Sequence, residues 1–281
     1  MTVVVCVKVS EGLVLAADST VAIPGRLTIG GTTADGIVKT YNHGRKLCHI
    51  KDYPVGVLTW GLALIGSRNI ESLVREYEHG LLSVQDSEEQ GEALEFSVKD
   101  IASGLLSHLR AKYQDASAHA GDRGRRTLGV MVSGYSSSAF FPEQYLFELP
   151  RDEAVQPIRP DKDGKPDFGA NWYGLTDAIT RFHWGRDDNA MALLASKFSL
   201  APDDIATALR PLQYGIIFDG MPLQDAIDYA VFIVNLEIGR YRFAIGAPLC
   251  GGEIDVAVIT PEGFEWVDRR EWCVGHASMW S

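Results

Sequence analysis

A threonine at the second position of the chain can bring a nucleophile and a base together on one residue. Methionine aminopeptidase removes Met1 when a small residue such as Thr2 follows it, and Thr2 would then carry a free α-amine beside its hydroxyl. An α-amine has a reference pKa of about 7.7 to 8.0, so that a useful fraction is neutral near pH 7. A neutral amine beside a hydroxyl is the pairing used in covalent catalysis by an N-terminal threonine. Thr2 is therefore a candidate nucleophile.

The first half of the chain predicts the strands that would position Thr2. Apolar, β-branched runs separated by a short turn are typical of a tight antiparallel hairpin, and this one begins at Thr2 itself. The predicted strands here are residues 2–9, 13–18, 46–50 and 55–60, with a Gly- and Thr-rich loop at 20–44 that includes a short strand at 37–41. Gly61 is predicted to open a helical stretch, because apolar residues then recur at helical spacing.

The second half contains strand and helix patterns in separate groups. Helices are predicted over 64–80, 92–113, 176–184, 188–198, 202–212 and 222–240, and strands over 127–134, 139–149 and 254–260. A strand-like pair at 154–158 and 168–173 encloses a turn rich in Pro, Asp and Gly. Pro222 suits the first turn of its helix. Residues after 263 are predicted to be a tail.

The order of these elements favours an α+β protein. Strands and helices are grouped rather than alternating, which argues against a doubly wound parallel sheet. We expect a four-layer αββα sandwich, in which two antiparallel sheets pack together and helices cover both outer faces. The chain contains no internal repeat and no linker, so residues 1–281 are predicted to form a single domain.

Composition excludes several classes of function. The net charge of −11 would repel a phosphate backbone, so we expect no nucleic-acid partner. The start of the chain lacks the pattern of a signal peptide, and no apolar run approaches 18 residues, so we expect neither secretion nor a membrane. The four cysteines show no CxxC spacing and are interpreted as reduced thiols of a cytoplasmic protein.

The chain resembles proteasome β-type subunits, and particularly their bacterial proteasome-like relatives, among the N-terminal nucleophile hydrolases. The resemblance rests on the order and spacing of several motifs more than on any one of them. Those motifs are Thr2, the run Gly12-Leu13-Val14-Leu15-Ala16-Ala17-Asp18, Lys46-Leu47-Cys48-His49-Ile50, Thr59-Trp60-Gly61, Met221-Pro222-Leu223-Gln224-Asp225-Ala226 and Gly251-Gly252-Glu253-Ile254-Asp255-Val256. They extend along the whole chain, and are densest in 2–80 and 221–263.

The resemblance implies a threonine-type peptidase or amide hydrolase with the αββα fold. Thr2 would be the nucleophile, and Lys46 the active-site lysine that lowers the pKa of the Thr2 amine. Asp18 would pair with that lysine and hold it charged. Gly61 would present its backbone N–H to the developing oxyanion. No cofactor and no metal are implied.

Three positions depart from the family pattern. Where the family carries an Asp and a Ser that support the amine, just ahead of the two glycines, this chain has Ala247 and Cys250. Another supporting serine falls near Thr176, which is a candidate stand-in together with Cys250. Extra length is predicted as insertions near 20–44, 80–92 and 151–200, with a C-terminal tail at 264–281.

Two alternatives to a peptidase stay open. One is a structural ring subunit of the same fold without catalysis, which Ala247 and Cys250 favour. The other is an amidase or acylase acting on a small molecule, because insertions could narrow the site. For the peptidase we expect a peptide or protein substrate, a homo-oligomeric ring or spiral, and an ATPase unfoldase as a candidate partner. Leu81, Leu82 and Val84, which look exposed, would add apolar surface for such an assembly.

Overall fold

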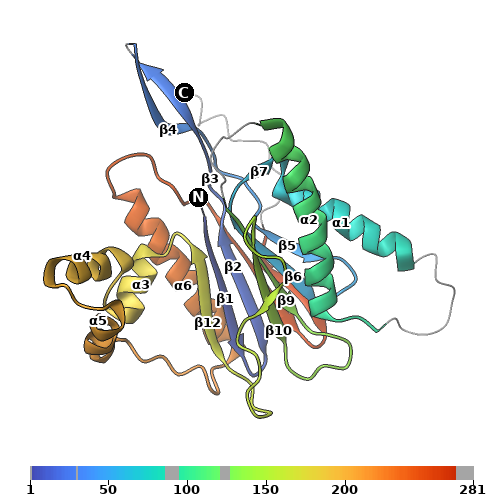
Figure 1. Cartoon of the computed structure of the whole chain (residues 1–281). Helices are drawn as coiled ribbons and strands as arrows, with labels where there is room; N and C mark the ends of the chain where they lie inside the picture. Colours follow the sequence, from blue (N-terminus) through green and yellow to red (C-terminus); the bar gives the residue numbers. More distant parts are fainter. Residues whose placement is uncertain (1, 30, 86–94, 121–126, 270–281) are drawn as a thin grey trace, which may run out of the picture.

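The structure, a computed structural model, describes residues 2–29, 31–85, 95–120 and 127–269. Figure 1 shows two sheets in the centre of the molecule, with α1 and α2 on one side and α3 to α6 on the other. The helices of the described part are α1 (Ile70–Gln85), α2 (Val98–Ala120), α3 (Asp177–Trp184), α4 (Asp188–Phe198), α5 (Pro202–Leu209) and α6 (Leu223–Arg242), and a 3-10 turn (Arg210–Leu212) follows α5.

The first sheet carries the N-terminal hairpin. Its order is β12-β1-β2-β13-β14, and every neighbouring pair is antiparallel. The strands are β1 (Val3–Val9), β2 (Gly12–Asp18), β12 (Gly169–Gly174), β13 (Ile254–Thr260) and β14 (Gly263–Asp268). β1 and β2 are buried along their full length, as expected for central strands covered on both faces. The predicted hairpin is confirmed, with Val4 opposite Ala17.

The second sheet has the order β11-β10-β9-β6-β5 and is also antiparallel. Its strands are β5 (Leu47–Ile50), β6 (Val55–Gly61), β9 (Leu128–Gly134), β10 (Glu143–Leu149) and β11 (Gln156–Pro157). Two two-stranded sheets lie outside these: a long one of β3 (Val21–Ile29) with β4 (Thr32–Tyr41), and a short one of β7 (Leu64–Ile65) with β8 (Arg68–Asn69). The α+β class with antiparallel sheets is thus confirmed.

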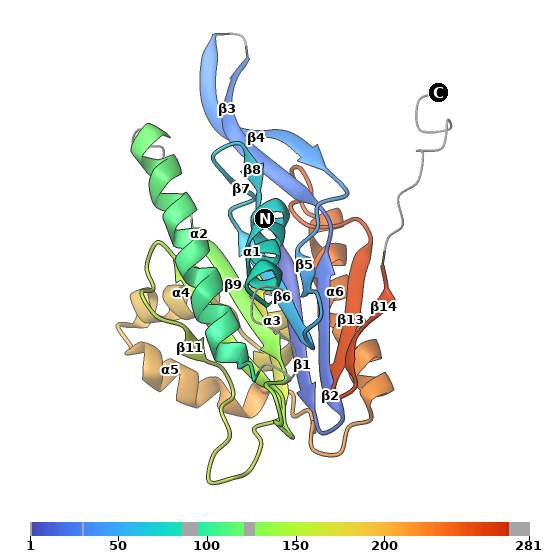
Figure 2. The same ribbon diagram turned by 90° about the vertical axis from the view of Figure 1, so that its right-hand side faces the viewer.

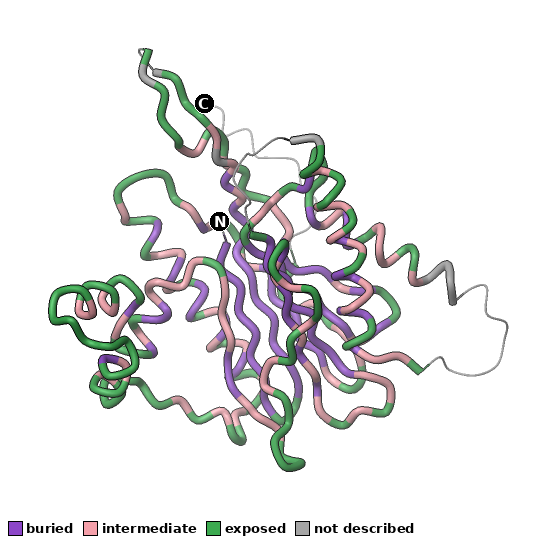
Figure 3. The backbone as a smooth tube through the Cα atoms, viewed as in Figure 1, coloured by how far each residue is buried: buried purple, intermediate pink, exposed green. Residues whose placement is uncertain are grey.

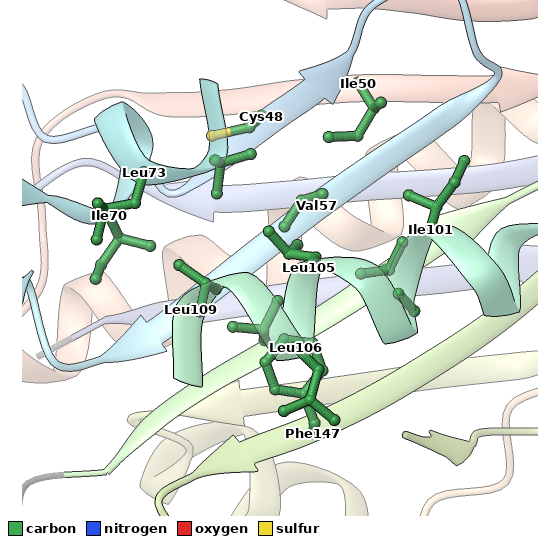
Figure 4. Close-up of a cluster of buried hydrophobic side chains, with 14 of the residues drawn as sticks. Cys48, Ile50, Val57, Ile70, Leu73, Ile101, Leu105, Leu106, Leu109 and Phe147 are labelled. Atoms are coloured by element: carbon green, nitrogen blue, oxygen red, sulfur yellow. The ribbon is translucent and has the colours of Figure 1, made fainter. Parts of the chain in front are cut away.

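Alternating side chains of the strands divide the core into three apolar clusters. In β1, Val3, Val5, Val7 and Val9 pack toward α6, whereas Val4 and Cys6 pack toward the second sheet. The cluster between the sheets joins β1, β2 and β13 to β5, β6 and β9. Figure 4 shows the cluster on the other face of the second sheet, where α1 and α2 cover β5, β6 and β10. Period-two burial therefore fixes which face each strand presents.

Two segments predicted to be irregular form strands. Residues 20–44 hold the long β3–β4 hairpin, which projects beyond the sheets in Figure 2 and consists largely of exposed residues in Figure 3. Its Pro and several Gly residues hid the strand pattern, because most of this two-stranded ladder is exposed and has no buried face that would require alternation. Likewise β14 occupies 263–268 of the predicted tail and pairs with β13, whereas 270–281 lie outside the described residues.

Three further expectations need correction. Gly61 ends β6 instead of opening a helix, and α1 begins only at Ile70 after the β7–β8 turn. The segments at 154–158 and 168–173 do not pair with each other: β11 joins β10, and β12 joins β1, so the turn between them connects the two sheets. Leu81 lies within α1 and packs on the core cluster, so it is not exposed surface.

Other predictions on these segments fall outside what the structure describes. Of the insertion predicted near 80–92, residues 86–92 belong to the part that is not described, and the side chains of Leu82 and Val84 lie outside it as well. Residues 151–200 hold β11, β12, α3 and α4. None of the described helices has the length and apolar character needed to cross a membrane.

Candidate active site

The carboxylate of Asp18 is the centre of a buried hydrogen-bond network at the end of β2. Its Oδ1 accepts from the N–H of Val3 at 2.9 Å and from Lys46 Nζ at 2.6 Å. Its Oδ2 accepts from the N–H of Gly251 at 3.0 Å and from that of Thr20 at 3.3 Å. Asp18 is 0% exposed. Because a buried carboxylate must be compensated by donors, this convergence explains how the residue is tolerated in the core.

Lys46 approaches Asp18 from the residue just before β5. Its Nζ donates to Asp18 Oδ1 and to the carbonyl of Thr20, both at 2.6 Å, and its side chain is 6% exposed. The backbone of Lys46 is tied to β6 by the N–H of Thr59, which donates to its carbonyl at 2.9 Å. The second sheet therefore supplies the cation and the first sheet the anion of one buried pair.

Thr2 lies directly before β1 and is held by its own backbone on two sides. Its carbonyl accepts from the N–H of Leu175 at 2.7 Å, and the next residue, Val3, donates to Asp18. Gly174 has φ +90°, and a Cβ there would lie 2.0 Å from the Thr2 carbonyl oxygen. Only glycine allows β12 to pass so close to Thr2. Thr2 is 5% exposed, so this anchoring occurs in the protein interior.

Gly61 ends β6 with φ +85°, and a Cβ there would lie 2.3 Å from the carbonyl oxygen of Thr127. Along this strand the N–H of Thr59 donates toward Lys46, whereas the N–H of Leu62 donates to Thr127 at 2.9 Å on the opposite edge. Successive N–H groups of a strand point to opposite edges. The N–H of Gly61 therefore lies on the edge of Lys46.

A cavity of about 400 Å³ brings Thr2, Lys46 and Gly61 to one space. One wall is formed by the β3–β4 hairpin and the segment after it. The other wall is formed by the end of β6, the β7–β8 turn and the start of α1. About half of the side chains at the walls are apolar, among them Val21, Ile23 and Leu62, and the others are polar or charged. The loop-like region predicted at 20–44 is thus a wall of the candidate site.

The two glycines before β13 close the network from behind. The carbonyl of Gly251 accepts from the N–H groups of Ser19 and Thr20 at 3.1 and 3.0 Å, while its own N–H binds Asp18. Gly252 has φ +75°, and a Cβ would lie 2.2 Å from Ser19 Oγ. The Gly-Gly motif therefore serves as a close-packed backbone support for the residues around Asp18.

Of the three positions that depart from the pattern of the resembled family, Cys250 directly precedes Gly251 of this network and Thr176 directly follows Leu175. The thiol of Cys250 is buried and donates to the carbonyl of Glu237 at 3.7 Å. Burial raises its pKa to about 12, so it stays protonated and acts as a weak donor in the core. Ala247 is exposed. Thr176 is the N-cap residue of α3, makes no side-chain capping bond, and directly follows the residue that binds Thr2.

Sequence reasoning missed Glu237, a fully buried residue of α6. Its Oε2 accepts from the N–H groups of Ala178 and Ile179 at 2.9 and 3.2 Å, at the start of α3. The signal was present in the sequence: Glu237 lies three and four residues after Val234 and Ile233, on the apolar face of its helix. A residue on the apolar face of a helix points toward the core. The sequence therefore indicates that the Glu237 carboxylate is buried.

In comparisons with known proteins, the chain matches no family model and no curated protein. Within the described ranges, no group of three or more His, Cys, Asp or Glu side chains is placed to hold a metal ion.

Proposed function

We propose that this protein is an N-terminal threonine hydrolase that cleaves amide bonds. The observation that carries the proposal is the buried Lys46–Asp18 pair, whose lysine lines the same cavity as Thr2. The helix and sheet packing supports an αββα fold of the N-terminal nucleophile type, consistent with clusters on both outer sheet faces and one between the sheets.

The proposed reaction begins once every residue that precedes Thr2 has been removed. The Thr2 hydroxyl oxygen attacks the substrate carbonyl, and its proton passes to the Thr2 α-amine, directly or through water. The ammonium of Lys46 favours the neutral amine and the developing alkoxide, and Asp18 holds that ammonium in place. The oxyanion forms beside the N–H of Gly61. The leaving amine takes the proton, and water then hydrolyses the ester on Thr2.

The cavity supports a substrate with an apolar group on the acyl side of the scissile amide. Side chains such as Val21, Ile23 and Leu62 would surround that group and exclude water from it. A peptide or protein is the substrate class we favour. A small-molecule amide remains the second enzymatic candidate, because the β3–β4 hairpin narrows one side of the cavity.

The proposal includes a cytoplasmic location, an ATPase unfoldase as a partner, and assembly into a homo-oligomeric ring or spiral. The assembly is supported by large apolar side chains exposed on the helical layer outside the first sheet and on the segment after α5. These are Trp184, Leu193, Phe198, Leu212, Tyr214 and Phe232. A repeated head-to-tail contact between copies closes into a ring or extends as a spiral. Light scattering that shows only a monomer with full activity would contradict this part.

A non-catalytic ring subunit is the competing candidate, and the exposed Ala247 and the inward thiol of Cys250 favour it. It requires neither a free Thr2 amine nor an active-site lysine. Intact-mass measurement of the purified protein tests the first point, because retention of any residue before Thr2 leaves no catalytic amine.

Substitution of Thr2 tests the hydrolase directly. Thr2→Ala should abolish amide hydrolysis and labelling by a threonine-directed covalent probe while the thermal melting temperature is kept, because the substitution removes the nucleophile and little packing. Thr28→Ala, at an exposed residue of β3 that does not line the cavity, is the matched control and should behave as wild type. Undiminished turnover in Thr2→Ala would overturn the nucleophile assignment.

A further inference from the structure

Glu237 joins the start of α3 to the chain segment that binds Thr2. Its Oε2 accepts from Ala178 and Ile179 in the first turn of α3. That turn follows Leu175, whose N–H donates to the Thr2 carbonyl at 2.7 Å. A side-chain carboxylate at a helix N-terminus fixes the first turn of that helix. Glu237 therefore also fixes the segment just before α3, which includes Leu175 and its hydrogen bond to Thr2.

The backbone of Glu237 is connected to Thr2 by a second series of contacts. The backbone carbonyl of Glu237 accepts from the thiol of Cys250. The next residue, Gly251, donates to Asp18 Oδ2, and Asp18 Oδ1 accepts from the N–H of Val3, directly after Thr2. The two routes form a closed circuit of contacts around Thr2, and Glu237 is the residue at which they meet.

This carboxylate is a buried acid that the sequence pattern did not nominate. The resemblance expects an acidic residue at 247 to support the amine, and this chain has an exposed alanine there. Glu237 is 0% exposed, and its Oε1 accepts no hydrogen bond from the described residues. Burying a carboxylate in this way lowers stability, so the hydrogen bonds that it makes indicate a specific role.

We propose that Glu237 is a positioning residue for the Thr2 site, which it supports from helix α6 through the start of α3. This rests on the proposed hydrolase function. The Glu237 side chain acts through the start of α3 and orients Thr2 without touching the substrate, whereas the contact with Cys250 is made by the backbone carbonyl of residue 237. The role depends on where its oxygens lie rather than on its charge.

Two substitutions separate position from charge. Glu237→Gln keeps an oxygen acceptor at the same reach and removes the charge, whereas Glu237→Asp keeps the charge and draws the oxygens away from α3. Asp228→Asn, on the exposed face of the same helix, is the matched control, since Asp228 accepts from the Gln224 side chain within that helix.

Glu237→Asp should lower kcat by about ten- to a hundredfold, because a small displacement of a reacting group is costly. Its KM should stay within about threefold, since substrate binding is not altered. Glu237→Gln and Asp228→Asn should keep kcat within about threefold of wild type. Deuterium exchange at the N–H of Leu175 should accelerate in Glu237→Asp alone.

The reverse order, with Glu237→Gln the more damaged variant, would show a role for the charge and overturn the proposal. Wild-type kcat and unchanged exchange in Glu237→Asp would also overturn it. If wild-type protein neither hydrolyses amides nor labels at Thr2, the hydrolase assignment fails. The exchange of Leu175 then still decides whether Glu237 positions this segment.

Discussion

Two lysines are buried in the first part of this chain, and they differ in what surrounds them. Lys8 belongs to β1, and its Nζ donates to Asp161 Oδ1 at 3.3 Å and to the carbonyl of Arg159 at 3.4 Å. Lys46 binds Asp18 at 2.6 Å. The side chain of Asp161 is 44% exposed, whereas that of Asp18 is 0% exposed.

The difference shows that burial alone does not mark a lysine as functional. Lys8 lies six residues along the chain from Thr2, about 20 Å at the rise of a strand. Its partners belong to the connection between the two sheets, and it does not line the cavity. Lys46 lines the cavity together with Thr2. A buried lysine that lines a cavity together with the proposed nucleophile is a candidate for chemistry, whereas a buried lysine whose partners lie in a connecting segment is a structural tie.

The largest expected difference between the two lysines is in stability, when the carboxylate of each pair is removed. Asp18→Asn should lower the free energy of unfolding by about 3–5 kcal/mol, because it leaves Lys46 buried without its counter-ion. Asp161→Asn should cost less, because the Asp161 carboxylate is 44% exposed and the carbonyl of Arg159 still accepts from Lys8. Urea denaturation of both variants gives the two values. Equal losses would mean that the two lysines are held in the same way.

Replacing each lysine should affect catalytic activity differently in the two pairs. Lys46→Met should lower kcat/KM for amide hydrolysis by about 10²–10³-fold, because the charge that favours the developing alkoxide is lost. Lys8→Met should leave kcat/KM within about threefold of wild type, because Lys8 is remote from the cavity. Steady-state kinetics with one fluorogenic amide substrate measures both variants. Comparable losses in the two would refute the distinction.

Two glycines extend the comparison to the backbone. Gly252 supports the Asp18 network at φ +75°, and Gly164 lies in the connection beyond Lys8 at φ +72°. Gly164→Ala should cost about 1–2 kcal/mol, the penalty of a left-handed residue alone. Gly252→Ala should cost more, since its Cβ would also lie 3.0 Å from the carbonyl oxygen of Asn42. Thermal unfolding of the pair provides the measurement, and equal costs would show that the site backbone is no more tightly packed.

Much of the fold was predictable because its signals are local. The hairpin from Thr2 to Asp18, the pair at 46–60 and the strand at 254–260 each show apolar β-branched runs, and the structure forms strands there. The helix from Pro222 onward was predicted from its apolar face and is α6. Periodicity indicates an element, but it does not indicate the partner, so β11 and β12 were paired wrongly.

The sequence by itself determined which residues are available for chemistry and roughly where each element lies. Thr2, Asp18, Lys46 and Gly61 could be nominated from the order and spacing of motifs. Only the tertiary structure decided that three of them share a cavity, and that the fourth, Asp18, is buried with the lysine. It also decided the contacts of Glu237, because contacts between residues 178, 237 and 250 depend on how helices pack on a sheet. Local sequence sets backbone preferences, whereas burial and hydrogen-bond partners across such distances arise only from packing.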